Sequence, residues 1–434
     1  MNLKTTLSAL ILTLLIAASA WAASVTVTLP NGSVWRGQTD DRVVVEYRQG
    51  AMQQKLTGVL VKAGDMYIVV REDGGSNEVP IFRTDLVSLA SAGEAEASDA
   101  DEGSASPGGK AAEPNADETG DKDDAAGNEA GGVFYLPLSG MVGLEFRPEE
   151  IESIVAQADA AGPGQTIVLD IESGGGSVVE YIIIAQTIMD AKKKHSLVAW
   201  VGEAISAAAG TALACDRMVF KDNARLGAIT MLRGGGIAVS DYEEEKWITM
   251  LKNVLRSSNY SEYWARPMVR NDSYISYIKD PVTGECEYFD SPQYEPGEVV
   301  LSNYGENCVL GVDLAVECCL AYGRADSKEE LAAVLDMDEW VDLGSGQKMH
   351  DDWHDLCARC ERDYQKSGAR LNMLGEYDQL VRIRKEIDIY KGWLRWWKRA
   401  PNKMMMMGAP DPEQLDRMIE ALERQLRELT RGGG

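Results

Sequence analysis

The chain has 434 residues, too many for one ordinary core, so two or three domains are expected. Hydrophobic residues make up 45% of it, enough to bury a sizeable core, and the formal net charge of −26 argues against nucleic acid as a partner. These values are typical of a multidomain globular protein with an acidic surface.

Residues 1–23 have the pattern of a secretory signal peptide. Lys4 precedes an apolar run at residues 7–18, and the Ala-Trp-Ala sequence at 20–22 has small side chains where a signal peptidase cuts. A short membrane anchor is the alternative, but the run is below the roughly 18 residues that a spanning helix needs. We therefore expect export to the periplasm or another part of the cell envelope.

Residues 24–90 alternate apolar and polar side chains in short runs, separated by turn signals such as Pro-Asn-Gly at 30–32. This pattern predicts a small all-β barrel of the SH3 or Sm type. No catalytic constellation falls in it, so a protein-binding adaptor and a plain packing module are both compatible with it.

Residues 91–132 are rich in Ala, Gly, Asp, Glu, Ser and Pro and nearly free of large apolar side chains. Such a segment buries too little surface to offset its ordering entropy, which predicts a disordered acidic linker. An acidic recognition tail is the alternative.

The stretch at 166–230 has the pattern of a catalytic unit. An apolar run at 167–171 ends in the Ser-Gly-Gly-Gly-Ser turn at 173–177, and a second run at 197–201 leads to Ser206 and an alanine-rich helix. Two strands thus each deliver a loop of small residues, so backbone N–H groups from both loops can face one small volume. An oxyanion hole beside a serine nucleophile is built in this way.

The glycine turn and the serine helix resemble the Clp/crotonase superfamily. The resemblance is strongest to its serine-protease branch: the Clp proteolytic subunit, signal peptide peptidase A and the NfeD-type proteases. Residues 173–178 are similar to the oxyanion turn of that branch, with Gly174 where a proline is usual, and residues 206–216 match its nucleophile helix. The resemblance covers about residues 133–345 and implies an α/β fold of stacked ββα units.

The resemblance also implies roles for individual residues. Ser206 is the expected nucleophile, and the N–H groups of Gly175, Gly176 and Ala207 are the expected oxyanion hole. The alternative for Ser206 is a helix N-cap serine in a protein that kept the fold and lost the activity.

Three residues of this region are candidates for the general base. A polar helix beginning near Asp241 contains Lys246, forty residues after Ser206, and a lysine at a comparable distance is the base in NfeD-type enzymes. Lys252 is the competing candidate. His195 precedes the serine, whereas the catalytic histidine of the Clp proteolytic subunit follows it, so a Ser-Lys dyad is preferred. A lysine base has to be neutral, and desolvation favours that form.

Residues 346–434 have helical patterns. A leucine repeat near heptad spacing predicts a short coiled coil, either between chains or within one chain, over Leu415, Met418, Leu422, Leu426 and Leu429. The mixed aromatic and basic run at 393–399 is typical of a membrane interface, with buried core aromatics as the favoured alternative.

Seven cysteines cannot all pair within one exported chain. His350, His354, Cys357 and Cys360 share a helical face, but ten helical residues span about 15 Å, so one helix cannot supply four zinc ligands. No metal is therefore predicted; inert thiols are favoured over a Cys357–Cys360 disulfide.

Three other cysteines lie in apolar surroundings and are predicted to be in the core: Cys215, Cys318 and Cys319. Cys319 belongs to a predicted helix at 314–321 that is similar to the closing helix of the family, where it replaces a glycine.

Together these features predict an exported serine endopeptidase that cleaves proteins or peptides without a cofactor. Family members often form rings, so a homo-oligomer is expected, and contact with a membrane surface is compatible with the sequence. A catalytically inactive Clp-fold scaffold that binds proteins is the main alternative. Crotonase-type acyl-CoA chemistry is disfavoured because coenzyme A thioesters are cytosolic.

Overall fold

The computed structural model describes residues 24–49, 52–64, 67–73, 78–92, 132–233 and 237–431. The chain divides into two compact units, residues 1–114 and residues 115–434. The predicted signal peptide and nearly all of the predicted linker lie outside the described residues.

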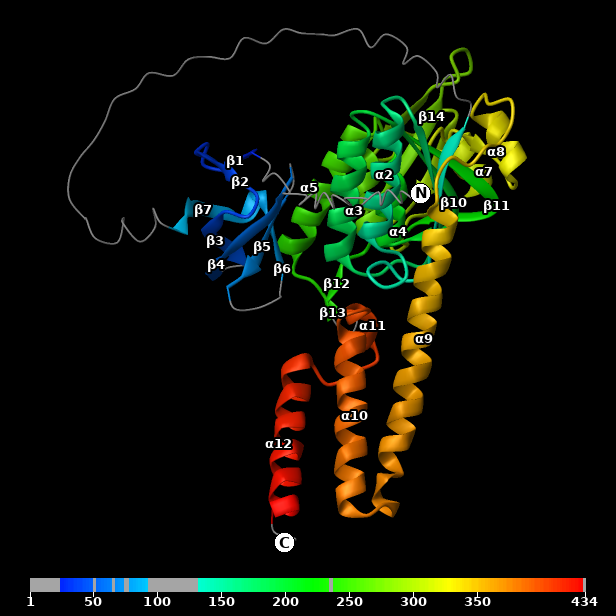
Figure 1. Cartoon of the computed structure of the whole chain (residues 1–434). Coiled ribbons are helices and arrows are strands. Elements are labelled where there is room, and N and C mark those ends of the chain that lie inside the picture. The colour runs from blue at the N-terminus through cyan, green and yellow to red at the C-terminus, as the bar shows by residue number, and fades with distance from the viewer. Residues whose placement is uncertain are drawn as a thin grey trace, which may run out of the picture. The chain divides into compact units, whose positions relative to one another are not determined.

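The first unit consists of antiparallel strands (Figure 1). A hairpin pairs β1 (Ser24–Thr28) with β2 (Val34–Gln38). A five-stranded sheet has the order β6 (Glu78–Phe82), β5 (Tyr67–Glu72), β4 (Met52–Ala63), β3 (Arg42–Gln49) and β7 (Leu86–Ser91). Val27 and Trp35 of the hairpin lie in the same apolar core as Val43 and Val70 of the sheet. The apolar side chains that alternate along these strands therefore face one shared core.

The second unit is built on a six-stranded sheet. Its main path is β17 (Val309–Gly311), β11 (Arg217–Gly227), β10 (Ser196–Ile205), β9 (Thr166–Ser173) and β8 (Val133–Ser139), with β18 (Gly323–Arg324) also paired to β11. Strands β8 to β11 run parallel, so their carboxyl ends meet at one edge. The predicted α/β class is confirmed.

Helices cover both faces of this sheet. α2 (Pro148–Ala161), α3 (Val178–Ala191) and α4 (Ala207–Leu213) each follow a strand and pack on one face (Figure 1). On the other face, Tyr135 and Trp200 pack with Leu331 of α8 (Lys328–Val334) and with Trp340. A parallel sheet needs such cover because its strands are apolar on both sides.

Between the sheet and the C-terminal helices, the chain forms smaller elements. These are β12 (Leu232–Arg233), β13 (Ile237–Ala238), α5 (Asp241–Ser257), η2 (Glu262–Trp264), α6 (Ala265–Val269), β14 (Ile275–Lys279), β15 (Cys286–Phe289), β16 (Glu298–Ser302) and α7 (Val312–Glu317). α5 begins at Asp241, where the polar helix was predicted, and Ser240 and Glu243 cap it reciprocally.

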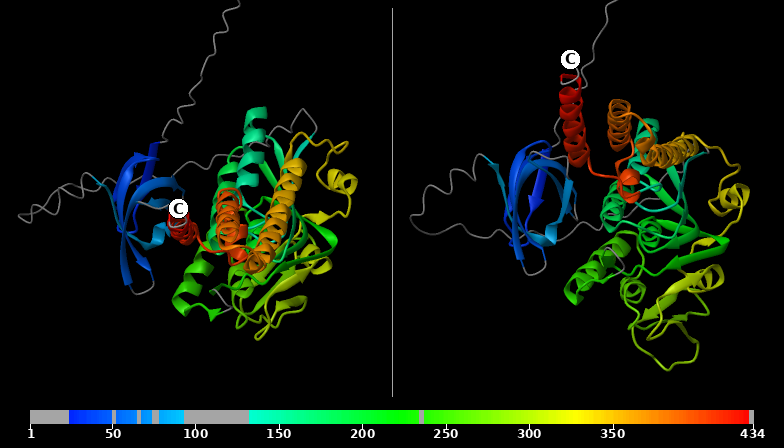
Figure 2. Two further views of the ribbon diagram at one scale, coloured as in Figure 1. Left: turned by 60° about the horizontal axis from the view of Figure 1, so that its bottom comes forward. Right: turned by 90° about the horizontal axis from the view of Figure 1, so that it is seen from below.

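The C-terminal region is helical. It contains α9 (Gly346–Asn372), η3 (Leu374–Glu376), α10 (Gln379–Trp397), α11 (Pro401–Met406) and α12 (Pro412–Arg431). The three long helices lie side by side and extend away from the sheet (Figures 1 and 2). In the part of the chain that is described, no helix is both long and apolar enough to span a membrane.

The leucine repeat of α12 packs within the chain. Leu415 and Ile419 are buried in one cluster with Ile387 of α10, and the rest of the repeat is partly buried there. Trp393 is buried in the same cluster, which confirms the core interpretation for this aromatic residue. The amphipathic pattern therefore identified a packing face correctly, and α10 of the same chain covers it.

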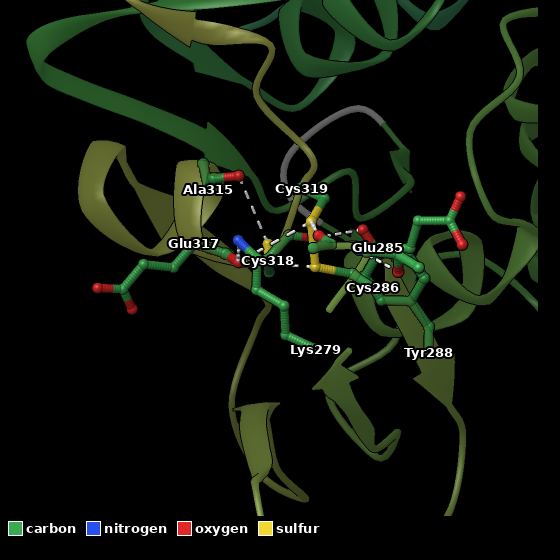
Figure 3. The surroundings of a disulfide bond; sticks show 10 residues. Lys279, Glu285, Cys286, Tyr288, Ala315, Glu317, Cys318 and Cys319 are labelled. Atoms are coloured by element: carbon green, nitrogen blue, oxygen red, sulfur yellow. Dashed lines mark hydrogen bonds between the residues drawn. A yellow bond between two sulfur atoms is a disulfide. The ribbon is translucent and has the colours of Figure 1, made fainter. Parts of the chain in front are cut away.

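The structure overturns the prediction for one cysteine. Cys319 was predicted to be in the core, but it is exposed and forms a disulfide with Cys286, the first residue of β15 (Figure 3). The helix predicted at 314–321 exists as α7 but is shorter than predicted, because α7 ends at Glu317 and Cys319 has a φ of +62°. A residue in the left-handed region ends an α-helix, so the helix does not continue through Cys319.

The disulfide joins two segments that the chain holds together in other ways too. The Lys279 ammonium donates to the Glu317 carbonyl at 3.1 Å, and the Tyr288 hydroxyl donates to the Cys318 carbonyl (Figure 3). The three-stranded sheet β15-β14-β16 is thereby fastened to the end of α7.

The other five cysteines are free, buried thiols. Cys215 and Cys318 are in the core as predicted, and Cys357 and Cys360 are unpaired, as the favoured prediction held. Burial raises the pKa of both the Cys357 and the Cys360 thiol to about 11, so neither is a reactive thiolate at neutral pH.

Thiol titration tests the pairing. In denaturant without reductant, five thiols should react, since only Cys286 and Cys319 are bonded. Cys286→Ser should lower the free energy of unfolding by about 2–4 kcal/mol, because the bond closes a long loop in the unfolded chain. Reductant should lower the wild-type melting temperature and leave that of the variant unchanged; seven reactive thiols would contradict the pairing.

Candidate active site

Ser206 occupies a strained turn between β10 and α4. Its backbone has φ 58° and ψ −125°, a combination that is uncommon outside glycine and costs about 1–3 kcal/mol. The Ser206 N–H donates to the Gly227 carbonyl at 2.9 Å, which fixes the turn to the end of β11. A serine on a sharp strand-to-helix turn is how many hydrolases expose their nucleophile at the end of a sheet.

The Ser206 hydroxyl does not cap its helix. Its side chain makes no capping hydrogen bond to α4, and no hydrogen bond of Oγ to another described residue is found. The side chain is half-buried, so it can be reached. The N-cap interpretation of Ser206 is therefore wrong for its side chain.

The glycine turn after β9 approaches Ser206 directly. Gly175 has a φ of +98°, and a Cβ atom there would lie 2.6 Å from the Ser206 Cβ and 3.1 Å from its Oγ. At Gly176, a Cβ atom would lie 2.3 Å from the Val142 carbonyl oxygen. Residues without side chains are therefore needed where this turn meets Ser206 on one side and Val142 on the other.

The three predicted oxyanion donors differ in their present bonding. The Gly175 N–H donates to the Ser173 hydroxyl at 3.1 Å, and that hydroxyl donates to the Gly140 carbonyl at 2.5 Å. The two residues that flank Gly176 bind Val142: the Gly175 carbonyl accepts from the Val142 N–H, and the Ser177 N–H donates to the Val142 carbonyl. The N–H of Gly176 itself therefore points away from Val142. Ala207 opens α4, and N–H groups of a first turn have no acceptor inside the helix.

Ser173 was not predicted to belong to the site. The residue is 3% exposed, and its side chain connects the end of β8 with the glycine turn. A serine directly before three glycines was a weak signal, because only the fold shows which backbone groups its hydroxyl meets.

The structure holds α5 beside the serine turn. The indole N–H of Trp247 donates to the Ile229 carbonyl at 2.9 Å, two residues after Gly227, whose carbonyl binds Ser206. α5 is thus anchored on the same loop. Lys246 precedes Trp247 and is half-buried, and no hydrogen bond joins its ammonium to the Ser206 hydroxyl.

Lys252 and His195 lie elsewhere. Lys252 lines a separate cavity of about 750 Å³ with Arg266 and Tyr304. His195 is at the opposite end of β10 from Ser206, and that strand of ten residues is about 33 Å long. Its Nδ1 accepts from the Gln165 N–H at 3.3 Å, so Nε2 carries the proton toward Asp159 at 3.1 Å.

A serine hydroxyl, a histidine imidazole and an aspartate carboxylate lie in a row at the end of β8. The Ser139 Oγ lies 2.8 Å from His350 Nε2, and His350 Nδ1 lies 3.1 Å from an Asp351 carboxylate oxygen. The adjacent backbone donors are occupied, because the N–H of Gly140 donates to the Glu172 carbonyl and that of Met141 to the Glu145 carboxylate. The set therefore has a nucleophile and a base without an open oxyanion hole.

His350 and His354 stack with ring centroids 4.0 Å apart. Within the described parts of the chain, no group of three or more His, Cys, Asp or Glu side chains is arranged to hold a metal ion.

Residues 136–285 match the model of the family NfeD1b, N-terminal domain. This segment is similar to the N-terminal domain of NfeD1b proteins. The match covers about a third of the chain and includes the glycine turn, Ser206 and Lys246. No curated protein matches the chain.

Solved structures also resemble the chain. They include a membrane-bound stomatin-specific protease, 1510-N, as a serine-to-alanine variant: 14% identity, 46% of this chain and 83% of that one covered, TM-score 0.35. The 1510-N membrane protease specific for a stomatin homolog from Pyrococcus horikoshii has 14% identity, coverages of 46% and 77%, and a TM-score of 0.31. ClpP1 from Listeria monocytogenes has 16% identity and a TM-score of 0.30, and the match covers 45% of this chain and 94% of that one.

The close approach of the two loops can be tested by stability. Gly175→Ala should lower the free energy of unfolding by about 1–3 kcal/mol, because the new methyl group meets Ser206 and φ is positive. Gly174→Ala is the matched control, since no atom lies within 4 Å of its Cβ position. Equal melting temperatures for the two variants would show that the loops do not meet as described.

Proposed function

We propose that this protein is an exported serine endopeptidase of the Clp/NfeD type, with Ser206 as its nucleophile. The observation that carries the proposal is the strained, uncapped Ser206 at the end of β10, in contact with the glycine turn after β9. The strained backbone holds the Ser206 side chain in place although its hydroxyl makes no hydrogen bond to the protein. Such strain is typical of a residue whose side chain has to face a substrate.

In the proposed reaction, the Ser206 oxygen attacks the carbonyl carbon of a peptide bond while its proton passes to the neutral amine of Lys246. The N–H groups of Gly176 and Ala207 stabilise the oxyanion, and that of Gly175 joins them when it leaves the Ser173 hydroxyl. The Lys246 ammonium then protonates the leaving amine. Water hydrolyses the acyl-enzyme by the same route and restores Ser206.

The lysine has to approach the serine when substrate binds, because the two are not hydrogen-bonded in this structure. Catalytic hydrogen bonds are often made only in the substrate complex. Lys246 is preferred to Lys252 because its neighbour Trp247 holds α5 on the Ser206 loop, while Lys252 lines another cavity.

Export rests on two independent features. Residues 1–23 have the composition of a signal peptide, and the Cys286–Cys319 disulfide suits an oxidising compartment. A protein-binding scaffold without activity is the second candidate, favoured by the Gly175 N–H, which is already bonded to the Ser173 hydroxyl and so does not face an oxyanion in this structure.

Two substitutions at Ser206 separate activity from strain. Both Ser206→Ala and Ser206→Gly should abolish peptidase activity and labelling by a fluorophosphonate probe, since both remove the nucleophile. Ser206→Gly should also raise the melting temperature above that of Ser206→Ala, because glycine adopts a φ of 58° without strain. Labelling that persists in both variants, or wild-type protein that never labels, would favour the scaffold.

Three further substitutions test the base. Lys246→Arg should reduce kcat/KM by about 10²–10⁴-fold, because a guanidinium cannot accept the serine proton. Lys252→Arg and His195→Gln should leave activity within about a factor of two, as both side chains lie away from the serine. Loss of activity in Lys252→Arg alone would keep the dyad and change the lysine; full activity in all three would exclude a base from this set.

A further inference from the structure

A groove of about 910 Å³ lies on the hairpin formed by α9 and α10. Two carboxylates, Asp363 and Asp388, line it. Five cations also line it: Lys366, Arg370, Lys385, Arg395 and Arg399. The groove thus has a net positive lining in a chain whose formal net charge is −26.

These cations are exposed and lack carboxylate partners. In the described ranges, no Asp or Glu oxygen lies within 4.0 Å of any of the five. Two of them lie over aromatic rings instead: Lys385 Nζ is 4.5 Å from the Tyr377 ring centroid, and the Arg399 guanidinium is 4.7 Å from that of Trp396. Unpaired cations along a concave surface concentrate a positive potential.

The floor of the groove is ordered and open. Buried Trp393 donates its indole N–H to the Ser367 hydroxyl at 2.7 Å, which joins α10 to α9. Gly392 lies in the middle of α10, where glycine costs about 1 kcal/mol relative to alanine. A Cβ atom there would meet only the Arg395 guanidinium, at 3.7 Å, so packing does not require the glycine.

We propose that this groove binds the acidic segment at residues 117–129 of the same chain. That segment has six carboxylates and one lysine, and five of the carboxylates fall within residues 117–124. Opposite charges in a groove with aromatic walls suit an acidic peptide.

The length of chain also fits. Gly132 lies against Leu343, three residues before α9 begins, and Lys366 and Arg370 lie 20–24 residues along that helix, about 30–36 Å away. Residues 117–124 precede Gly132 by 8–15 positions, which an extended chain spans in about 26–50 Å. The carboxylates can therefore reach the cations within one chain, at the high effective concentration of a tether.

An anionic membrane surface is the competing occupant. A bilayer is broad and flat, whereas the cations line a cavity between two helices. The net charge of −26 also repels the whole protein from anionic lipid, a penalty that an intramolecular contact does not have. The observations thus favour the acidic segment.

Cleavage at Glu118 by a glutamate-specific endoproteinase tests the proposal in the full chain, with Ser206→Ala present to exclude self-digestion. The Lys366→Glu/Arg370→Glu variant should be cut at Glu118 about fivefold faster than its parent, relative to cleavage at Glu94. Gly392→Gln should act in the same direction, because its side chain fills the groove without changing charge. Salt at about 0.5 M should accelerate cleavage of the parent.

The matched control is Arg382→Glu/Arg384→Glu, which makes the same charge change on α10 outside the groove lining and should leave the rate unchanged. Equal rates in the two double variants would overturn the proposal. So would protection that grows with protein concentration, which would mean binding between chains. Binding to phosphatidylserine-containing vesicles that depends on Lys366 and Arg370, without any change in Glu118 cleavage, would assign the groove to membranes instead.

Discussion

The approach of the glycine turn to Ser206 is the constraint on which the candidate site depends. Parallel strands β8 to β11 deliver their loops to one edge of the sheet, and β9 and β10 are neighbours there. Their loops meet so closely that a Cβ atom on Gly175 would lie 2.6 Å from that of Ser206. The separation is set by the spacing of strands in a sheet, so only residues without bulk can occupy the turn. Backbone N–H groups and a hydroxyl are thereby gathered in one small volume.

The strain at Ser206 persists because its surroundings are rigid. All seven residues of α4 are buried, and the Ser206 N–H is bonded to the end of β11. Gly210 lets that helix pack on the Tyr181 ring, which contacts Trp247 of α5 edge-on. The turn, α3, α4 and α5 thus form one packed unit, and relaxation of the Ser206 backbone would disturb all of it. The proposed hydrolytic function explains the strained Ser206 backbone more directly than a scaffold function does, because a scaffold does not need a serine whose side chain leaves its helix uncapped.

Charge is distributed unevenly along the chain. The candidate site gathers backbone N–H dipoles beside one serine hydroxyl, whereas the α9–α10 hairpin concentrates unpaired cations in a groove. In an acidic protein, such a groove attracts the acidic segments of the same chain first, since a tether raises their effective concentration. If the segment at 117–129 binds there, the entry into β8 would be held near α9.

The sequence by itself determined the features that local patterns encode. The strand, glycine turn and serine helix were identified because each is contiguous, and the amphipathic repeat of α12 marked its buried face. What the tertiary structure decided are contacts between distant residues. Cys286 and Cys319 are 33 positions apart, and neither has a local signal of pairing. The Ser173 hydroxyl meets Gly140 only through the register of β8 and β9, and His195 and Ser206 are separated because one extended strand lies between them. Such contacts depend on how elements pack, which short-range side-chain periodicity does not encode.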